Sequence, residues 1–218
     1  MRQPDPPSDP ALLQAVERYY TGRLREHGAT AKGVDWNTEE SQRLRFDQLA
    51  RLWEQGERRD DRSVIDFGCG YGALLDYLRA AGSELRYQGF DISDAMIREA
   101  TSRAGARGRS TFTTDSARLE RADYVVASGV FNVKLESDAQ VWEAYMHQTV
   151  DTLASLATRG FAFNALTSYS DPEKRRDNLY YADPRYWFDH CKRTYSRFVT
   201  LIHDYPLYEF TILVRLQV

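Results

Sequence analysis

The sequence predicts an α/β fold: a doubly wound, seven-stranded sheet with an antiparallel terminal hairpin and an N-terminal helical lid. Three observations predict it. From Arg62 onward, short apolar runs alternate with amphipathic stretches, which is the pattern of β-α units on a parallel sheet. Residues 122–128 are nearly continuous in hydrophobicity, as expected of a parallel strand buried on both faces. The last two apolar runs, 197–203 and 207–216, are joined by a short link, so they are expected to be antiparallel neighbours.

The strands and helices of the main domain follow one another along residues 62–218. We expect strands at 63–67, 85–92, 110–114, 122–128, 159–166, 197–203 and 207–216. We expect helices at 73–81, 94–104, 138–157 and 183–192; the third has its apolar residues on one side. Ligands of such sheets bind beyond the carboxyl ends of the strands, so the functional residues are expected there.

Two further helices precede this domain. Residues 11–27 carry an apolar stripe and end at Gly28, a common stop signal. Residues 37–55 form the second helix, in which Asn37 and Glu40 have the spacing of a capping box. We expect residues 11–61 to form a lid. Residues 1–10 hold four of the seven prolines and no apolar run, which predicts a flexible arm.

The composition narrows the functional classes. The 218 residues fit one domain, and the formal net charge of −3 argues against a nucleic-acid partner. No apolar run approaches the length of a membrane span, and no cluster has metal-ligand spacing. The two cysteines cannot form a disulfide framework, so we expect a cytoplasmic protein. The 14 tyrosines exceed what packing alone needs, and we expect several, including Tyr19 and Tyr205, to line a ligand pocket.

A glycine-rich turn follows the first predicted strand. Asp66 precedes Gly68, Gly70 and Gly72, and glycines at alternate positions let the backbone approach a ligand closely. The spacing is neither the dinucleotide fingerprint nor a P-loop. An acidic residue in front of the glycines would repel a pyrophosphate, so the turn suits a ligand that bears an ammonium or sulfonium group.

Acidic residues also follow the second and third strands. Asp91 ends the second strand, 23 positions after Gly68, where a carboxylate accepts hydrogen bonds from ribose hydroxyls. Asp115 follows the third strand and could accept an adenine amino group. Ile92 and Met96 are expected to pack on the ring faces, and Ser116 and Ser128 complete the expected cofactor set at the same sheet edge.

The segment from Asp66 to Gly72, together with Asp91 and Asp115, resembles motifs I, II and III of class I S-adenosylmethionine (SAM)-dependent methyltransferases. The resemblance covers residues 62–218. It implies that SAM is the cofactor, with the three glycines along its methionine moiety, Asp91 on the ribose and Asp115 on the adenine. The N-terminal helices look like the variable lid of this superfamily.

Lid and loop residues supply the remaining candidates. Tyr20 and Trp36 could close over the sulfonium, because aromatic faces attract cations, and Arg45 could pair with the cofactor carboxylate. After the fourth strand, Asn132 could orient an amine or hydroxyl nucleophile. The long connection after the fifth strand holds three tyrosines that we expect to face the substrate, and the sixth strand ends at a candidate base: Tyr169, Tyr180, Tyr181 and His203.

Three functions fit these residues. The first is methyl transfer from SAM to a small-molecule metabolite; a Pro-Pro-aromatic motif, typical of nucleic-acid amino-methyltransferases, is missing after the fourth strand. The second is suggested by segments 164–169, 179–184, 188–192 and 203–211, which resemble a group of short bacterial methyltransferase-like proteins. Some relatives of this kind are azetidine-2-carboxylate synthases. These convert SAM into azetidine-2-carboxylate and methylthioadenosine. The third is a non-catalytic SAM-binding partner subunit.

Overall fold

The computed structural model describes residues 9–54, 62–105 and 109–217. Residues 1–8 of the predicted arm (residues 1–10) and the predicted lid boundary at residue 61 lie outside this range. Asp9, within the predicted arm, caps the first helix, which begins at Pro10. In the described residues, seven strands form one sheet: β1 Ser63–Phe67, β2 Arg86–Phe90, β3 Ser110–Thr113, β4 Ala122–Ala127, β5 Ala157–Leu166, β6 Phe198–Ile202 and β7 Glu209–Arg215. The helices are α1 Pro10–His27, α2 Glu39–Glu54, α3 Ala73–Ala80, α4 Asp94–Ala104, α5 Ala139–Leu156 and α6 Pro184–Thr194, with short 3-10 turns η1 Ala31–Val34, η2 Ser116–Arg118 and η3 Pro172–Lys174.

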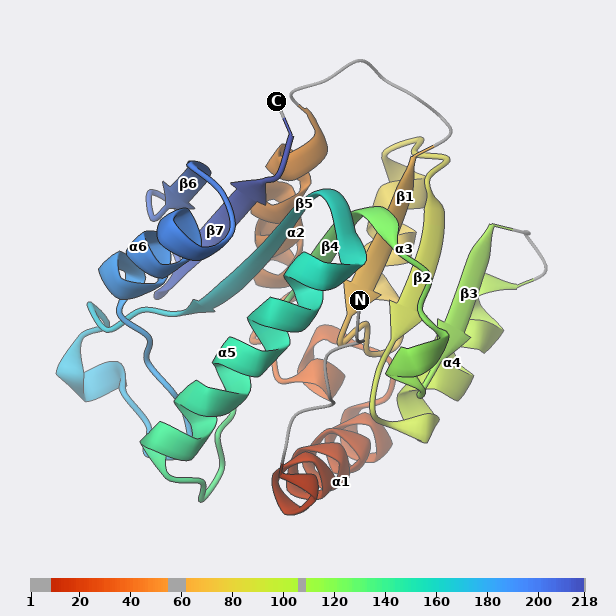
Figure 1. The fold of residues 1–218 in the computed structure, drawn as a ribbon. Coiled ribbons are helices and arrows are strands. Elements are labelled where there is room, and N and C mark those ends of the chain that lie inside the picture. The colour runs from red at the N-terminus through yellow and green to blue at the C-terminus, as the bar shows by residue number, and fades with distance from the viewer. Residues whose placement is uncertain (1–8, 55–61, 106–108, 218) are drawn as a thin grey trace.

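The sheet has the predicted doubly wound topology. Its strand order is β3-β2-β1-β4-β5-β7-β6 (Figure 1). β1 lies parallel between β2 and β4, with Val64 opposite both Tyr87 and Tyr124. β7 runs antiparallel to β5 and β6, which confirms the terminal hairpin. The order reverses direction between β1 and β4, so the switch point of the sheet lies where these two neighbours end.

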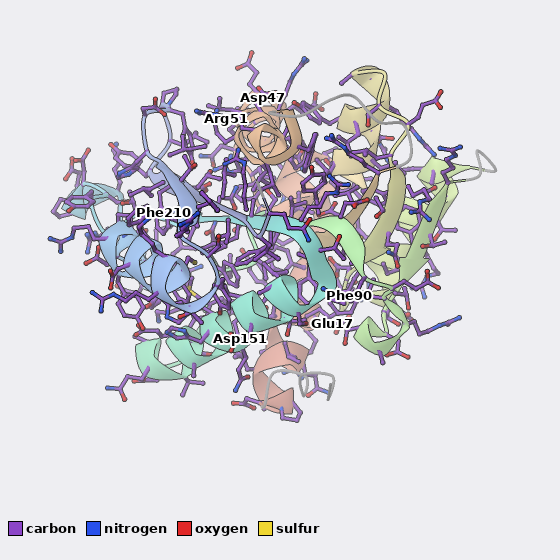
Figure 2. All side chains as sticks on the ribbon, turned by 45° about the horizontal axis from the view of Figure 1, so that its top comes forward. Glu17, Asp47, Arg51, Phe90, Asp151 and Phe210 are labelled. Carbon is purple, nitrogen blue, oxygen red and sulfur yellow. The ribbon has the colours of Figure 1, made fainter. Side chains whose placement is uncertain are left out.

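Helices cover both faces of the sheet (Figure 1). α2 and α3 pack on one face around Leu49, Leu74 and Val64, and α5 and α6 pack on the other face. Figure 2 shows Phe90 and Phe210 inside the molecule, whereas Arg51 points away from α2. The two apolar layers fix the strand ends in place, and this rigid edge carries the candidate site.

The lid helices pack against the carboxyl edge and one face of the sheet. α1 crosses below the strand ends (Figure 1), and the Thr21 and Ser93 hydroxyls lie 2.7 Å apart between α1 and α4. The cap of α2 differs from the expected one: Ser41 N donates to Thr38 Oγ1 at 3.1 Å and Thr38 N to Ser41 Oγ at 3.3 Å. The reciprocal pair is therefore shifted by one residue from Asn37 and Glu40, because α2 begins at Glu39.

Candidate functional site

A cavity of about 830 Å³, partly open to solvent, lies at the switch point of the sheet. It is bounded by the ends of β1, β2 and β4 and by the lid; we call it the first cavity. Nine of the thirteen residues that the sequence predicts for the cofactor line it: Tyr20, Trp36, Asp66, Gly68, Gly70, Asp91, Ile92, Met96 and Ser128. The structure thus brings together residues from the lid, the glycine turn and three strand ends.

Two glycines allow this close approach. Gly68 has φ +81°, and a Cβ there would lie 2.5 Å from Val130 Cγ2. Gly129, after β4, has φ +75°, and a Cβ there would lie 2.3 Å from the Trp36 ring. Its N–H donates to the buried Asn164 side chain at 2.8 Å. Only glycine fits either position, so the two turns let Val130 and Trp36 close the cavity from above the strand ends.

Asp91 is fixed at the end of β2 by two backbone donors. Gly70 N donates to its Oδ2 and Ser93 N to its Oδ1, each at 2.9 Å. Burial raises the pKa of Asp91 to about 6, and the two backbone hydrogen bonds oppose that rise. The side chain lines the first cavity in one fixed orientation, so its oxygens can accept further hydrogen bonds from a ligand.

Asp66 lies deeper, on β1. It is buried, and Tyr87 Oη donates to its Oδ2 at 2.6 Å. Burial raises the pKa of Asp66 to about 7; the Tyr87 hydrogen bond lowers it and the nearby Asp91 carboxylate raises it further. Its second oxygen receives no hydrogen bond from any residue that the structure describes. The carboxyl can therefore meet a cationic ligand group or hold a proton near neutral pH.

The electrostatics of the first cavity favour a cation. Among the described lining residues there are two carboxyl groups and no lysine or arginine. Three of the lining residues that were not predicted as ligand contacts carry an amide or hydroxyl group: Gln42, Tyr71 and Tyr145. Tyr71 donates to Gln42 Oε1 at 3.0 Å and so ties the glycine turn to α2, and Tyr145 reaches the cavity from α5. Tyr71 lies within the glycine motif and could have been proposed from it; Gln42 and Tyr145 carry no comparable signal.

Four predicted cofactor residues do not line this cavity. Gly72 instead packs against α4, where a Cβ would lie 3.4 Å from that of Ala100. Asp115 is exposed and accepts a hydrogen bond from Ala117 N at 3.0 Å, next to Ser116. Arg45 does not face the first cavity, because its guanidinium is bound by Glu209.

A second cavity, of about 760 Å³, adjoins the first. The two share Tyr20, Val34, Trp36 and Gly129 as a common wall. The rest of the lining comes from the lid, the loop after β4, the end of β5 with the long connection that follows it, and the start of β7. It is mainly polar and includes Asp35, Asn37, Arg45, Asn132, Ser170, Lys174, Arg176, Tyr181, Tyr208 and Glu209.

Of the five predicted catalytic residues, Asn132 and Tyr181 line the second cavity. The other three line neither cavity. Tyr180 turns toward α5, where its hydroxyl bonds with Glu143, and burial raises its pKa to about 12. Tyr169 is 59% exposed, and its ring centroid lies 5.9 Å from that of His203, which is also exposed. The predicted base, His203, therefore lies at the protein surface beside Tyr169 and not in either cavity.

Some of the aromatic residues expected at a ligand pocket lie at the two cavities, and others do not. Tyr20 and Trp36 form the wall between the cavities, and the Tyr19 hydroxyl donates to Asp35 Oδ2 at 2.9 Å beside it. Tyr205 was expected at the pocket but is buried in the apolar layer with α2 and α3, its hydroxyl 2.9 Å from Thr211 Oγ1. The tyrosine surplus is therefore shared between the pockets and the core.

Glu209 is the main residue that the sequence analysis missed. Arg45 donates to it twice, from Nε to Oε2 at 2.8 Å and from Nη2 to Oε1 at 2.7 Å. Asn132 Nδ2 donates to Oε1 at 3.3 Å, and Leu166 N donates to Asn132 Oδ1 at 3.2 Å. The Arg45 guanidinium lies over the Trp36 ring, 3.8 Å from its centroid. Glu209 therefore holds Arg45 and Asn132, two other lining residues of the second cavity, in position.

Two further properties of the described residues concern membrane insertion and metal binding. None of the helices combines the length and apolar character that crossing a bilayer requires. No three or more His, Cys, Asp or Glu side chains in the described ranges gather in a way that could hold a metal ion.

Comparison with known proteins gives one family and one similar sequence. Residues 24–199 match the family described as "Methyltransferase domain". The chain is 55% identical over 157 residues to Rv1506c of Mycobacterium tuberculosis strain H37Rv, which is provisionally named a methyltransferase. That match covers 72% of this chain and 94% of the mycobacterial protein.

Solved structures share the fold at low sequence identity. The magnesium protoporphyrin IX methyltransferase of Synechocystis PCC 6803, with bound SAH, has a TM-score of 0.64 at 20% identity and covers 93% of this chain and 98% of its own. The N-methyltransferase NodS of Bradyrhizobium japonicum WM9 has a TM-score of 0.63 at 19% identity, covering 91% and 97%. The DhpI-SAM-HEP complex has a TM-score of 0.64 at 17% identity, covering 95% and 99%.

Proposed function

The chain belongs to the methyltransferase domain family, and from that premise we propose that it transfers the methyl group of SAM to a small molecule held in the second cavity. As a member of this family it is a SAM-dependent methyltransferase, so the partner-subunit hypothesis is not taken further. The observation that carries the proposal is the common wall, formed by Tyr20, Val34, Trp36 and Gly129, between a cation-favouring cavity and a polar one.

The first cavity fits SAM. Asp91, held by two backbone donors, suits the paired hydroxyls of a ribose, and Asp66 suits the ammonium group of the methionine moiety. The aromatic faces of Tyr20 and Trp36 suit a sulfonium. When bound, SAM supplies an electrophilic methyl group. Asp115 remains our candidate for the adenine amino group, with Ser116 beside it, and Gly72 sets the start of α3 behind the loop.

The acceptor is expected to enter through the second cavity. Methyl transfer needs the nucleophile in line with the bond that breaks, and a shared wall where donor and acceptor meet beside Trp36 would provide that alignment. Gly129 permits Trp36 to approach the backbone, and the Arg45 guanidinium lies over the ring. Tyr20 and Trp36 would also exclude water from the reacting atoms.

Proton removal is expected to be a minor part of the chemistry. The carboxylates that line the second cavity are Asp35 and Glu209, and each forms an ion pair with an arginine: Asp35 with Arg23 at 3.2 Å and Glu209 with Arg45 at 2.7 Å. Both carboxylates are thus already engaged by a cation and are not free to accept a proton from the substrate. No histidine lines this cavity among the described residues. The arrangement therefore favours a nucleophile that is already unprotonated, such as a carboxylate oxygen or a neutral amine.

Cyclisation of SAM to azetidine-2-carboxylate and methylthioadenosine is the second candidate, and one observation favours it. The buried Asp66, with its pKa raised to about 7, lies in the cavity where the α-ammonium group is expected. It could take up the proton that this amine must lose before it attacks the γ-carbon. The reaction needs no acceptor, and so it leaves the second cavity without a role.

Incubation with SAM tests both candidates. We expect SAM alone to remain intact, and S-adenosylhomocysteine (SAH) to form only when a suitable acceptor is added. Mass spectrometry distinguishes SAH from methylthioadenosine and azetidine-2-carboxylate. Protein-dependent methylthioadenosine with the azetidine product, above spontaneous decay, would replace the first candidate with the second. The matched control is Asp91→Ala, which should yield neither product set.

A further inference from the structure

We propose that the acceptor carries an anionic group, a carboxylate or a phosphate ester, and that Lys174 and Arg176 bind it in the second cavity. The inference deepens the proposed function and rests on it. Both residues lie in the long connection after β5, and both line the cavity. Neither was singled out from the sequence, where they stand within a run of exposed charges.

Among the charged residues that line the cavity in the described part of the chain, Lys174 and Arg176 are the two without an ion-pair partner. Arg45 is neutralised by Glu209 and Asp35 by Arg23. Neither Lys174 nor Arg176 forms a side-chain hydrogen bond or an ion pair with any residue in the described part of the chain. Two positive charges at one end of the cavity, with the other charged lining residues in ion pairs, attract an anion and select against a cationic ligand.

Backbone hydrogen bonds fix the position of the segment that carries these two cations. Arg176 N donates to Tyr181 Oη at 3.0 Å, and Leu179 N donates to Arg176 O at 3.1 Å. Leu135 N donates to Asn178 O at 3.0 Å, which ties the connection to the loop after β4. The Arg175 guanidinium lies 5.2 Å from the centroid of the Tyr181 ring. The segment is thus braced from both ends and can present Arg176 in a defined position.

The two cations and the wall shared with the first cavity lie at different ends of the second cavity. Lys174 and Arg176 are exposed residues at its rim, whereas Trp36 and Gly129 belong to the wall it shares with the first cavity. An acceptor held by its anion at the rim would direct its other end toward the methyl donor. The guanidinium of Arg176 can bind a carboxylate or phosphate through two hydrogen bonds, while Lys174 acts as a point charge. The proposal therefore places the anion and the reacting atom at opposite ends of one small molecule.

Binding to the SAH-saturated protein tests the proposal without turnover. The probes are matched pairs: aromatic and aliphatic carboxylic acids with their primary amides, and phosphate monoesters with their alcohols, each titrated by calorimetry. We expect the anionic member of at least one pair to bind at least tenfold more tightly than its neutral partner. The variant Lys174→Gln/Arg176→Gln should lose at least tenfold of that affinity. The control Arg98→Gln/Arg193→Gln, which removes two exposed helix charges elsewhere, should change it less than twofold.

Three results are decisive. Equal binding of anionic and neutral partners overturns the proposal, as does wild-type anion affinity in the double variant or a panel in which nothing binds while SAH does. Carboxylates binding without phosphates, or the reverse, identifies which anion the site takes. If the anions bind as proposed but none is methylated and SAM alone is cyclised, the anion site stands and the proposed methyl transfer fails.

Discussion

Arg45 on the lid helix α2 and Glu209 on the last strand β7 form a buried, bidentate ion pair across 164 positions of the sequence. The side chains are 8% and 1% exposed. The pair joins the lid to the sheet, and it holds Trp36 against Gly129 in the wall between the two cavities. One contact therefore links the packing of the lid to the shape of both cavities.

Breaking this pair from one side should be costly. Arg45→Met leaves the Glu209 carboxylate buried without its cation, so we expect the free energy of unfolding to fall by about 3–5 kcal/mol. Arg45→Met/Glu209→Leu removes both charges and should recover much of that loss. Urea unfolding of the wild type, both single variants and the double variant measures the coupling. Additive single effects would show that the pair is not an energetic unit.

Gly68 should be needed for the cofactor rather than for the fold alone. Gly68→Ala places a Cβ 2.5 Å from Val130 Cγ2, so we expect SAH affinity to fall at least tenfold. Gly82→Ala is the matched control: φ there is +71°, and its Cβ would meet nothing within 4 Å. Both variants should lose about 1 kcal/mol of stability from the backbone strain. Calorimetric titration with SAH separates them; equal affinities would contradict the role of the glycine turn.

Asp66 predicts a pH dependence of stability. Its pKa is raised from 3.8 to about 7 in the folded protein, so the folded state holds a proton that the unfolded state has lost between these values. More protons on the folded state mean that this residue makes stability fall as pH rises from about 4 to 7, by at most about 1.4 kcal/mol per unit.

The variant Asp66→Asn isolates this contribution. It keeps an acceptor for the Tyr87 hydroxyl but does not titrate, so its stability relative to wild type should rise across the same pH range. Denaturant unfolding at intervals from pH 4 to 8, without ligand, gives the difference. A constant difference across the range would show that Asp66 ionises in the folded protein as readily as in the unfolded chain.

Much of the fold follows from local sequence patterns. The predicted strand 63–67 matches β1 at both ends, and the hairpin of β6 and β7 follows from the short link between two apolar runs. The predictions are wrong where one sequence pattern is compatible with more than one local structure. Val141 was counted on the buried side of α5 but is 43% exposed, because the stripe is wider than the face that the sheet covers. The capping pair of α2 moved by one residue because neighbouring Thr and Asn side chains can serve equally.

Residues of the candidate site could be predicted where the sequence signal is local, and not where it depends on distant residues. The glycine turn and Asp91 could be placed because each directly follows a strand, and the order of the sheet brings strand ends together. Arg45 was misassigned because its partner Glu209 lies 164 positions away, and no local pattern reveals that pairing. Tyr169 and His203 were expected inside because they follow strands. The long connection turns Tyr169 outward, and that path depends on backbone contacts such as Thr167 N to Tyr208 O. His203 is exposed after β6, which is the outermost strand on that side of the sheet.

The proposed function depends most directly on Asp91 as the ribose ligand of the cofactor. Calorimetric titration of SAH into wild type, Asp91→Ala and Asp94→Ala tests it, with circular dichroism to verify the fold. Asp94 is an exposed carboxylate in the first turn of α4, and its removal should change affinity less than twofold. Loss of the Asp91 carboxylate should weaken SAH at least a hundredfold, as expected for two hydrogen bonds to a charged group of about 1.5–3 kcal/mol each. A folded Asp91→Ala protein that binds SAH with wild-type affinity would contradict the account.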